Sequence, residues 1–319
     1  MKTSVMTPIR ATIFLLSFLV VSISCKQKSS STDEAMLVSN EEVILETVAP
    51  KKPLSNAFKG YWYAGKAEIT SYALEQARYG ELRDGNAVLI YVTEPFLPEK
   101  QVKADHSNPG NVSVLKLNAT KNFLTGIYPY SILSSTFYPV HDNQHALKTS
   151  LSVQEWCGHV YAQINNRNTF EYTSHSYFEK EADQELSLDK AMLENEVWTK
   201  LRINPFDLPI GDIKVVPSLE YLRLSHTKIE AYNAVGSLSS NEGMASYTLT
   251  YPSLDRTLQI DFSPEFPYTI QGWTESFKSG FGPNAKVLTT KATKMKSINT
   301  AYWGQNSNQD LVLRDSLGL

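Results

Sequence analysis

The sequence predicts a mainly β fold, in which one or two large antiparallel sheets curve into a half-barrel-like shape around one prominent helix at about residues 187–204. Three observations support this prediction. Many segments between residues 57 and 304 alternate apolar and polar side chains and end at Gly, Pro, Asn or Asp, which is typical of strands joined by turns. Only one segment has apolar residues at helical spacing. Long strands that contain glycine curl readily, because sheets twist and bulges bend them.

The N-terminus predicts where the protein resides. Lys2 and Arg10 precede the apolar run 11–21, which has the length of a signal peptide and is shorter than the roughly 20 residues that cross a bilayer. Small residues lead to Cys25, an arrangement that resembles the bacterial lipobox, in which the chain is cut before the cysteine and the cysteine is lipidated. We therefore expect a signal peptide at 1–24, a lipid on Cys25, and a place on the outer membrane facing the periplasm. An ordinary secretory signal is the alternative.

Composition limits the classes of function. The 319 residues are 42% hydrophobic, which allows a large core, and their formal charge of −3 becomes −5 when Lys2 and Arg10 leave with the signal peptide. This acidic balance gives no electrostatic basis for binding nucleic acid. If Cys25 carries the lipid, Cys157 is the one remaining cysteine, so no disulfide can form within the chain. No later segment is long and apolar enough to cross a membrane.

The chain is expected to hold its folded region behind a tether. Residues 25–56 are mostly polar, lack periodicity and end near two prolines, so they predict a lipidated N-terminus followed by a flexible linker. The β-rich domain then covers 57–304, either as one unit or as two halves that meet near the proline-containing stretch 205–217. Residues 305–319 are expected to form a C-terminal tail.

The first half of the domain is predicted to consist of strands. Asp84-Gly85 lies between the strand-like segments 69–78 and 87–93, and such a dipeptide is a strong signal for a hairpin turn. The run 88–92 is almost continuously apolar, which predicts a strand buried on both faces. Further strands are expected at 112–117, 128–138, 151–165 and 169–178, with a turn at 165–168 and an acidic, solvated connector at 179–185.

One helix and six strands are predicted after that connector. The helix ends before Pro205 and rests on five apolar residues at helical spacing, namely Leu188, Met192, Leu193, Val197 and Leu201. The strands are expected at 220–224, 227–237, 244–251, 256–262, 268–275 and 286–303, with a turn at 251–256.

The densest group of reactive side chains lies in the stretch 154–159. If one strand runs through 151–165, then Glu155, Cys157 and His159 share a face, and they could form an activated nucleophile or part of a metal site. However, residues two apart on a strand are roughly 6–7 Å apart, which is too far for a direct Cys–His hydrogen bond. The favoured interpretation is that Cys157 packs in the core, as free cysteines commonly do. These three residues are therefore weak candidates, and no catalytic residue is assigned.

A second histidine pair gives a weaker signal. His141 and His145 are four residues apart with Asp142 between them, but they follow Pro139 and are expected in a loop, where a transition metal would need ligands from elsewhere. His106, His175 and His226 are isolated and carry no signal. The sequence has no P-loop, dinucleotide-binding glycine motif, nucleophile elbow or HExxH helix. It therefore predicts neither a cofactor nor a metal.

Three stretches carry a resemblance to a known family. Residues 62–72, 77–81 and 154–159 resemble a family of uncharacterised envelope lipoproteins of Gram-negative bacteria, some of which carry the name "septum formation inhibitor Maf". The Ser-x-Ser-Pro-Arg-Arg motif of the Maf nucleotide pyrophosphatases is absent, so none of their residues is carried over. The expected architecture is similar to the half-barrel folds of the LolA and LolB type, which cradle acyl chains.

These expectations lead to a binding protein as the first hypothesis for function. A lipid-anchored envelope protein without enzymatic activity would bind an apolar or amphipathic ligand, or an envelope partner, on the concave face of its sheet. The alternatives are a hydrolase or metal-dependent enzyme that uses Glu155, Cys157 and His159, and a structural scaffold. The membrane is an expected partner through the lipid, nucleic acid is not, and the sequence specifies no protein partner.

Overall fold

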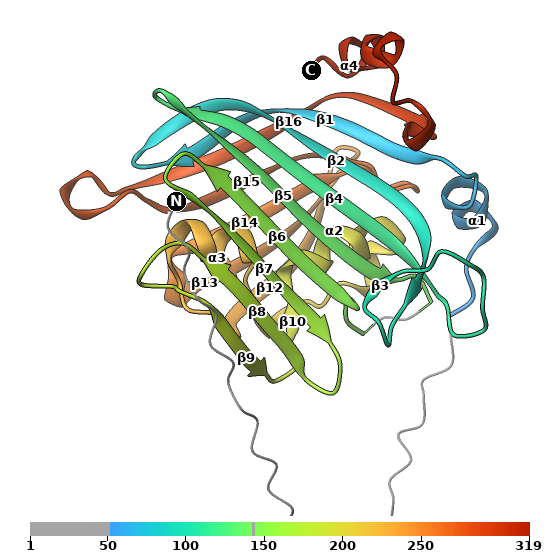
Figure 1. Cartoon of the computed structure of the whole chain (residues 1–319), viewed down its shortest axis with the longest axis horizontal. Helices are drawn as coiled ribbons and strands as arrows, with labels where there is room; N and C mark the ends of the chain where they lie inside the picture. Colours follow the sequence, from blue (N-terminus) through green and yellow to red (C-terminus); the bar gives the residue numbers. More distant parts are fainter. Residues whose placement is uncertain (1–51, 142–143) are drawn as a thin grey trace, which may run out of the picture. The chain divides into compact units, whose positions relative to one another are not determined.

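The computed structural model describes residues 52–141 and 144–319 (Figure 1). The predicted signal peptide, Cys25 and almost all of the predicted tether lie outside these residues. Residues 50–319 form one compact unit, which contains every described strand and helix and the whole buried core. Among the described residues, no helix is long and apolar enough to cross a membrane.

The described residues form one large curved sheet of 16 strands that does not close on itself, with four α-helices. The strands are β1 (Ala67–Arg78), β2 (Glu81–Leu97), β3 (Val102–Lys103), β4 (Val112–Thr125), β5 (Tyr128–Pro139), β6 (Lys148–Glu155), β7 (Gly158–Asn166), β8 (Phe170–Ser176), β9 (Gln184–Leu188), β10 (Met192–Leu193), β11 (Gly211–Val216), β12 (Tyr232–Asn241), β13 (Met244–Tyr251), β14 (Arg256–Phe262), β15 (Ile270–Ser279) and β16 (Lys286–Thr300). The helices are α1 (Asn56–Trp62), α2 (Glu194–Ile203), α3 (Leu219–Ser225) and α4 (Val312–Leu317).

The two halves of the chain join in the middle of the sheet. The last strand, β16, pairs with the first, β1, so that Ala67 lies opposite Thr300. From this pair, β2 to β9 extend the sheet on one side and β15 to β10 extend it on the other. The pairings are antiparallel except β10 with β11, and the edges β9 and β10 are separated in sequence by residues 189–191. The mainly β, curved fold predicted from the sequence is confirmed.

Helices α2 and α3 lie inside the curve of the sheet (Figure 1). The main core is built there, between the helices and the concave faces of strands from both halves, and it includes Val197 and Leu201 of α2. A smaller core covers the convex face of β1 and β2, where Leu317 of α4 packs against Val88 and Val92. Residues 88–92 therefore have apolar neighbours on both faces, as predicted.

The structure corrects two element boundaries of the first half. The hairpin between β1 and β2 turns at Tyr79 and Gly80, whose φ angles of 57° and 76° suit a two-residue turn, and not at Asp84-Gly85. Gly85 lies within β2, where an added Cβ would meet the carbonyl oxygen of Asn122 and lie 2.8 Å from Cβ of Phe123. The segment predicted as one strand at 151–165 is instead the hairpin β6–β7, with its turn at residues 156–157. The turn predicted at 165–168 does separate β7 from β8.

The second half contains two further corrections. The predicted helix begins at Glu194 and not near 187, because Leu188 lies in β9 and Met192 and Leu193 form β10. Residues 219–225, predicted as a strand from 220 to 224, form helix α3, whose Ser218 Oγ accepts a hydrogen bond from the Tyr221 N–H at 3.2 Å. Strands β13 and β14 have the predicted bounds. The predicted tail contains helix α4.

Candidate functional site

A groove of about 390 Å³ lies beside the open edge of the sheet. We call it the edge groove. One wall is the concave face of β7, β8 and β9, and the other is α3 with the loop that follows it. Its lining residues are Val160, Ala162, Tyr172, Ser174, Lys180, Glu181, Gln184, Leu186, Leu219, Leu222, Arg223, His226, Thr227, Lys228 and Ile229.

Strand register determines which side chains reach the groove from the sheet. Tyr172 of β8 lies opposite Leu186 of β9, and Ser174 lies opposite Gln184, so alternation along both strands directs these four residues to the concave face. Leu186 is 43% exposed although it belongs to this inner face. Among the described residues, no strand pairs with β9 on its outer side, which leaves an apolar side chain of the edge open toward the groove.

Helix α3 forms the opposite wall. Leu219, Leu222 and Arg223 have helical spacing and line the groove together, whereas Tyr221 contacts the ring of Phe277 on the other side of the helix. The helix ends at His226, whose φ of 53° is left-handed and turns the chain toward Ile229. The apolar part of the groove is therefore shared by buried residues of the strands and of α3.

Charged side chains form one part of the lining, which we call the mouth of the groove; Arg223 and Glu181 are mostly buried in it, whereas His226 is exposed. Glu181 Oε1 lies 2.7 Å from Nδ1 of His226 and 3.1 Å from Nη1 of Arg223. The Arg223 guanidinium also lies 4.4 Å from the ring centre of Phe178. Burial opposes ionisation of Glu181, but hydrogen bonds from His226 and Ser176 and the charge of Arg223 outweigh it, so the pKa of this carboxyl lies below its ordinary value. The exposed Lys180 adds positive charge to the rim, whereas the exposed Lys228 is paired with Glu230 at 2.6 Å.

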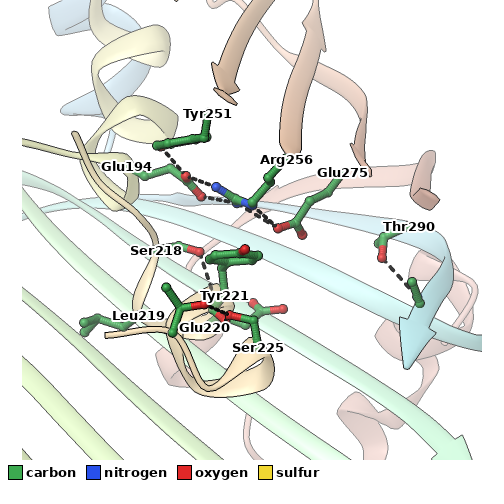
Figure 2. Close-up of polar contacts among 12 residues, drawn as sticks. Glu194, Ser218, Leu219, Glu220, Tyr221, Ser225, Tyr251, Arg256, Glu275 and Thr290 are labelled. Atoms are coloured by element: carbon green, nitrogen blue, oxygen red, sulfur yellow. Dashed lines mark hydrogen bonds and ion pairs between the residues drawn. The ribbon is translucent and has the colours of Figure 1, made fainter. Parts of the chain in front are cut away.

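Behind α3 lies a buried polar cluster that fixes α2. Figure 2 shows Arg256 of β14 between Glu194 of α2 and Glu275 of β15, with the Tyr251 hydroxyl on Glu194. The two guanidinium nitrogens Nη1 and Nη2 donate to Glu194 at 2.5 and 2.7 Å, and Nε donates to Glu275 at 2.7 Å. Burial opposes ionisation of Glu194, but the charge and hydrogen bonds of Arg256 outweigh it and keep its pKa below the ordinary value.

The other end of α2 carries a second buried ion pair. Arg202 donates to both carboxylate oxygens of Glu68 in β1, at 2.6 and 2.7 Å. Its guanidinium lies between Trp62 and Tyr91, 5.0 and 4.7 Å from the ring centres. The hydroxyl of Tyr61 also donates to Glu68. Because β1 and β14 belong to different halves of the chain, the two pairs tie α2 to both sides of the sheet.

A small cavity lies between the Arg256 cluster and strands β2, β4 and β5. Its volume is about 60 Å³, and it is lined by Trp198 and Trp273 together with the ion pair of Lys121 and Glu220, whose atoms lie 2.7 Å apart. This volume suits a few water molecules and is well below the roughly 300 Å³ of a ligand pocket. The edge groove is therefore the better candidate for a bound organic molecule.

The structure places the predicted group of reactive residues on an exposed hairpin. Cys157 lies in the turn between β6 and β7 and is exposed, so the prediction that it packs in the core is wrong. The turn also removes the shared strand face on which Glu155, Cys157 and His159 were expected to lie. The Cys157 N–H donates to Glu155 Oε2 at 2.7 Å, and the carboxylate of Glu155 raises the pKa of the thiol. Because the thiolate is the nucleophile, this arrangement works against activation of Cys157.

The predicted histidine pair does not converge on one point. Nδ1 of His141 lies 3.1 Å from the carbonyl oxygen of Lys52, whereas Nδ1 of His145 lies 3.1 Å from Oε1 of the buried Glu196. Asp142 lies outside the described residues. Within residues 52–141 and 144–319, no group of three or more His, Cys, Asp or Glu side chains could hold a metal ion.

Sequence reasoning missed the edge groove. The acidic stretch 179–185 was expected to be a solvated connector, but Glu181 lies at the mouth and β9 begins at Gln184. His226 carried no signal, and residues 220–224 were assigned to a strand. The groove brings together residues far apart in the sequence, such as Glu181 and Arg223, which are 42 residues apart, so no local pattern could have identified it.

No protein-family model, curated protein or solved structure matches this chain. The resemblance to envelope lipoproteins and to the LolA and LolB folds therefore stays a prediction.

Proposed function

We propose that the protein is a lipid-anchored component of the bacterial cell envelope that binds an amphipathic ligand, without enzymatic activity, in the edge groove. The observation that carries this proposal is the groove itself. Its volume of about 390 Å³ is within the range of small-molecule sites. Apolar residues line its interior, and charged residues are concentrated at its mouth.

The arrangement of the lining suits a molecule with an apolar tail and a polar head. The tail would pack against Val160, Leu219 and Leu222, which are buried, and against the more open Leu186. The head would lie at the mouth, near Arg223 and Lys180. Arg223 and His226 share Glu181, so a ligand acid could take over contacts that the carboxylate makes in the free protein.

The proposed location comes from the N-terminus of the sequence. A cationic segment, an apolar run and small residues before Cys25 support export and lipidation. A lipid anchor would hold the domain at a membrane, where amphipathic molecules are available. Mass spectrometry of the N-terminal peptide of the mature protein tests this part, since a lipidated Cys25 differs in mass from an unmodified one.

Ligand binding can be tested with residues 50–319, which form the compact unit. The probe is a fluorescent fatty acid, titrated against the protein in solution. Leu186→Asp places a negative charge in the groove and is expected to weaken binding at least about tenfold, because an apolar contact is replaced by a carboxylate that resists desolvation and repels the fatty acid's own carboxylate. Ser187→Asp adds the same charge to the other face of β9 and is expected to leave binding unchanged.

Two outcomes would contradict the proposal. One is that the wild-type domain takes up no fluorescent fatty acid and carries no lipid when it is purified from cells and analysed by native mass spectrometry. The other is that the two substitutions have equal effects on binding. Either result would leave the structural scaffold as the better interpretation, since the interior of the sheet is otherwise filled by α2 and α3.

A further inference from the structure

A continuous series of aromatic rings follows the turns at one end of the sheet. Phe281 lies 6.3 Å from Tyr79, Tyr79 lies 6.5 Å from Tyr130, Tyr130 lies 6.1 Å from Tyr128, and Tyr128 lies 6.5 Å from Trp156, all between ring centres. We call these five residues the aromatic arc. They come from three hairpins and from the start of β5.

Antiparallel pairing explains why these residues meet. The hairpins β1–β2, β4–β5, β6–β7 and β15–β16 all turn at the same end, because each pair continues the register of the one before it. These turns lie at the left of Figure 1, and α1 lies at the right. A bulky side chain near each turn therefore contributes to one common surface.

The tips of this end carry large apolar side chains that solvent reaches. Ile127 in the β4–β5 turn is 81% exposed, Trp156 is 68% exposed and Phe281 is 58% exposed. Tyr177, which follows β8, is 78% exposed and lies against Gly158 in the same shallow hollow as Trp156. Single exposed apolar residues are common on proteins, but here Trp156 and Phe281 are the exposed ends of the arc, whose middle ring, Tyr130, is buried, and several such side chains at one end of the sheet indicate an interaction surface.

The aromatic arc reaches the lining of the edge groove through Phe281, and Tyr177, which shares a shallow hollow with Trp156, approaches the groove from the other end of the arc. Phe281 lies 5.7 Å from the ring of His226, which belongs to the groove lining. At the other end, Tyr177 contacts Phe178 at 6.1 Å, and Phe178 lies under the guanidinium of Arg223. A surface that the arc touches would therefore also face the groove.

We infer that the aromatic arc docks on the surface of a phospholipid bilayer. This inference rests on the proposed function, because it supplies the route by which an amphipathic ligand would enter the groove. Trp and Tyr combine an apolar ring with a polar group, and such residues favour the boundary between lipid headgroups and acyl chains. Side chains at turn tips can enter that boundary without bringing strand edges into the lipid.

The length of chain before the domain is compatible with this orientation. The chain enters the domain at α1, whereas the arc lies at the far end of β1, beyond Arg78. Strand β2, with 17 residues, measures about 57 Å, and the 26 residues from 26 to 51 span up to about 90 Å when extended. A chain anchored at Cys25 can therefore bring the aromatic arc to the same bilayer.

Flotation of residues 50–319 with vesicles of phosphatidylethanolamine and phosphatidylglycerol tests the inference. The wild-type domain is expected to float with the vesicles. Ile127→Ser combined with Trp156→Ser is expected to weaken this binding at least about tenfold, because two large apolar side chains are lost. The control combines Phe206→Ser with Ile210→Ser, an exposed apolar pair before β11 at the other end of the sheet, and it is expected to bind like the wild type. Circular dichroism and thermal melting show that each variant is folded.

The outcomes separate this inference from the proposed function. Absence of vesicle binding by the wild type, or an equal loss in the control, would overturn membrane docking and favour a protein partner for the arc. Fatty-acid binding in solution could still hold in that case. Conversely, Leu186→Asp is expected to lose fatty-acid binding and to float with the vesicles like the wild type, so that loss of binding in the edge groove can be told apart from loss of membrane docking.

Discussion

Replacement of Arg256 by methionine would remove the guanidinium that holds α2 against the second half of the sheet. The side chain of Arg256 is 1% exposed and makes hydrogen bonds with the carboxylates of Glu194 and Glu275. It also lies 4.1 Å from the ring centre of Tyr221. Methionine fills much of the same volume, so the main change is electrostatic, and two carboxylates remain behind without their cation.

The expected loss of stability follows from this burial. Removing one partner of a buried ion pair commonly destabilises a protein by about 3–5 kcal/mol, because the other partner stays buried and uncompensated. Arg256 has two such partners, so we expect at least about 4 kcal/mol at pH 7. The loss of stability caused by Arg256→Met should be smaller at lower pH, since a buried carboxylate without a neighbouring cation takes up a proton more readily.

Urea unfolding of residues 50–319 measures this loss as a fall in the midpoint at an unchanged slope. The matched control is Arg167→Met, which breaks the exposed pair of Arg167 and Glu171 and should cost no more than about 0.5 kcal/mol. If Arg256→Met proves too unstable to fold, Glu275→Gln removes one charge and keeps an acceptor, and it should show a smaller loss. A cost below about 1 kcal/mol for Arg256→Met would refute the argument.

Three further predictions concern stability and reactivity. The carboxyls of the two ion pairs of α2, Glu68 and Glu194, have pKa values below the ordinary 4.5, so the stability that they contribute is present above that pH and is lost as the pH falls through their folded-state pKa values. The urea midpoint should therefore drop steeply below pH 4.5 or so. A flat profile of the midpoint between about pH 5 and 3 would contradict this prediction. Gly85→Ala should destabilise the domain by about 1–3 kcal/mol in the same assay, because its Cβ would press on Phe123, whereas Gly60→Ala in α1 meets no atom and should be neutral or stabilising. Glu155→Gln should lower the pKa of Cys157 and speed its reaction with a thiol reagent at pH 7.5 or so, whereas equal rates would show that the carboxylate does not affect the thiol.

Local patterns in the sequence were sufficient for the fold class and for several elements. Alternation along 244–251 and 256–262 depends only on neighbouring residues, and β13 and β14 have those bounds. The apolar run 88–92 predicted a strand buried on both faces because its composition leaves no polar face, and the structure covers it with the main core on one side and α4 on the other.

Tertiary structure decided the features that depend on distant residues. Asp84-Gly85 has the local signal of a turn, but Asn122 and Phe123 of the neighbouring strand require a glycine there, and the turn forms at Tyr79-Gly80. Pairing of β6 with β7 likewise moved Cys157 from a predicted strand face to an exposed turn.

The candidate site depends on the same kind of distant contact. Leu186 reaches the edge groove because β9 pairs with β8, and Arg223 faces it because residues 219–225 fold as a helix inside the curve of the sheet. The sequence by itself determined a curved, mainly β domain, since this feature arises from composition and short-range periodicity; the lipid anchor stays a prediction. Only the tertiary structure decided where the groove and the aromatic arc lie, because strand register and helix packing bring together residues that no local pattern connects.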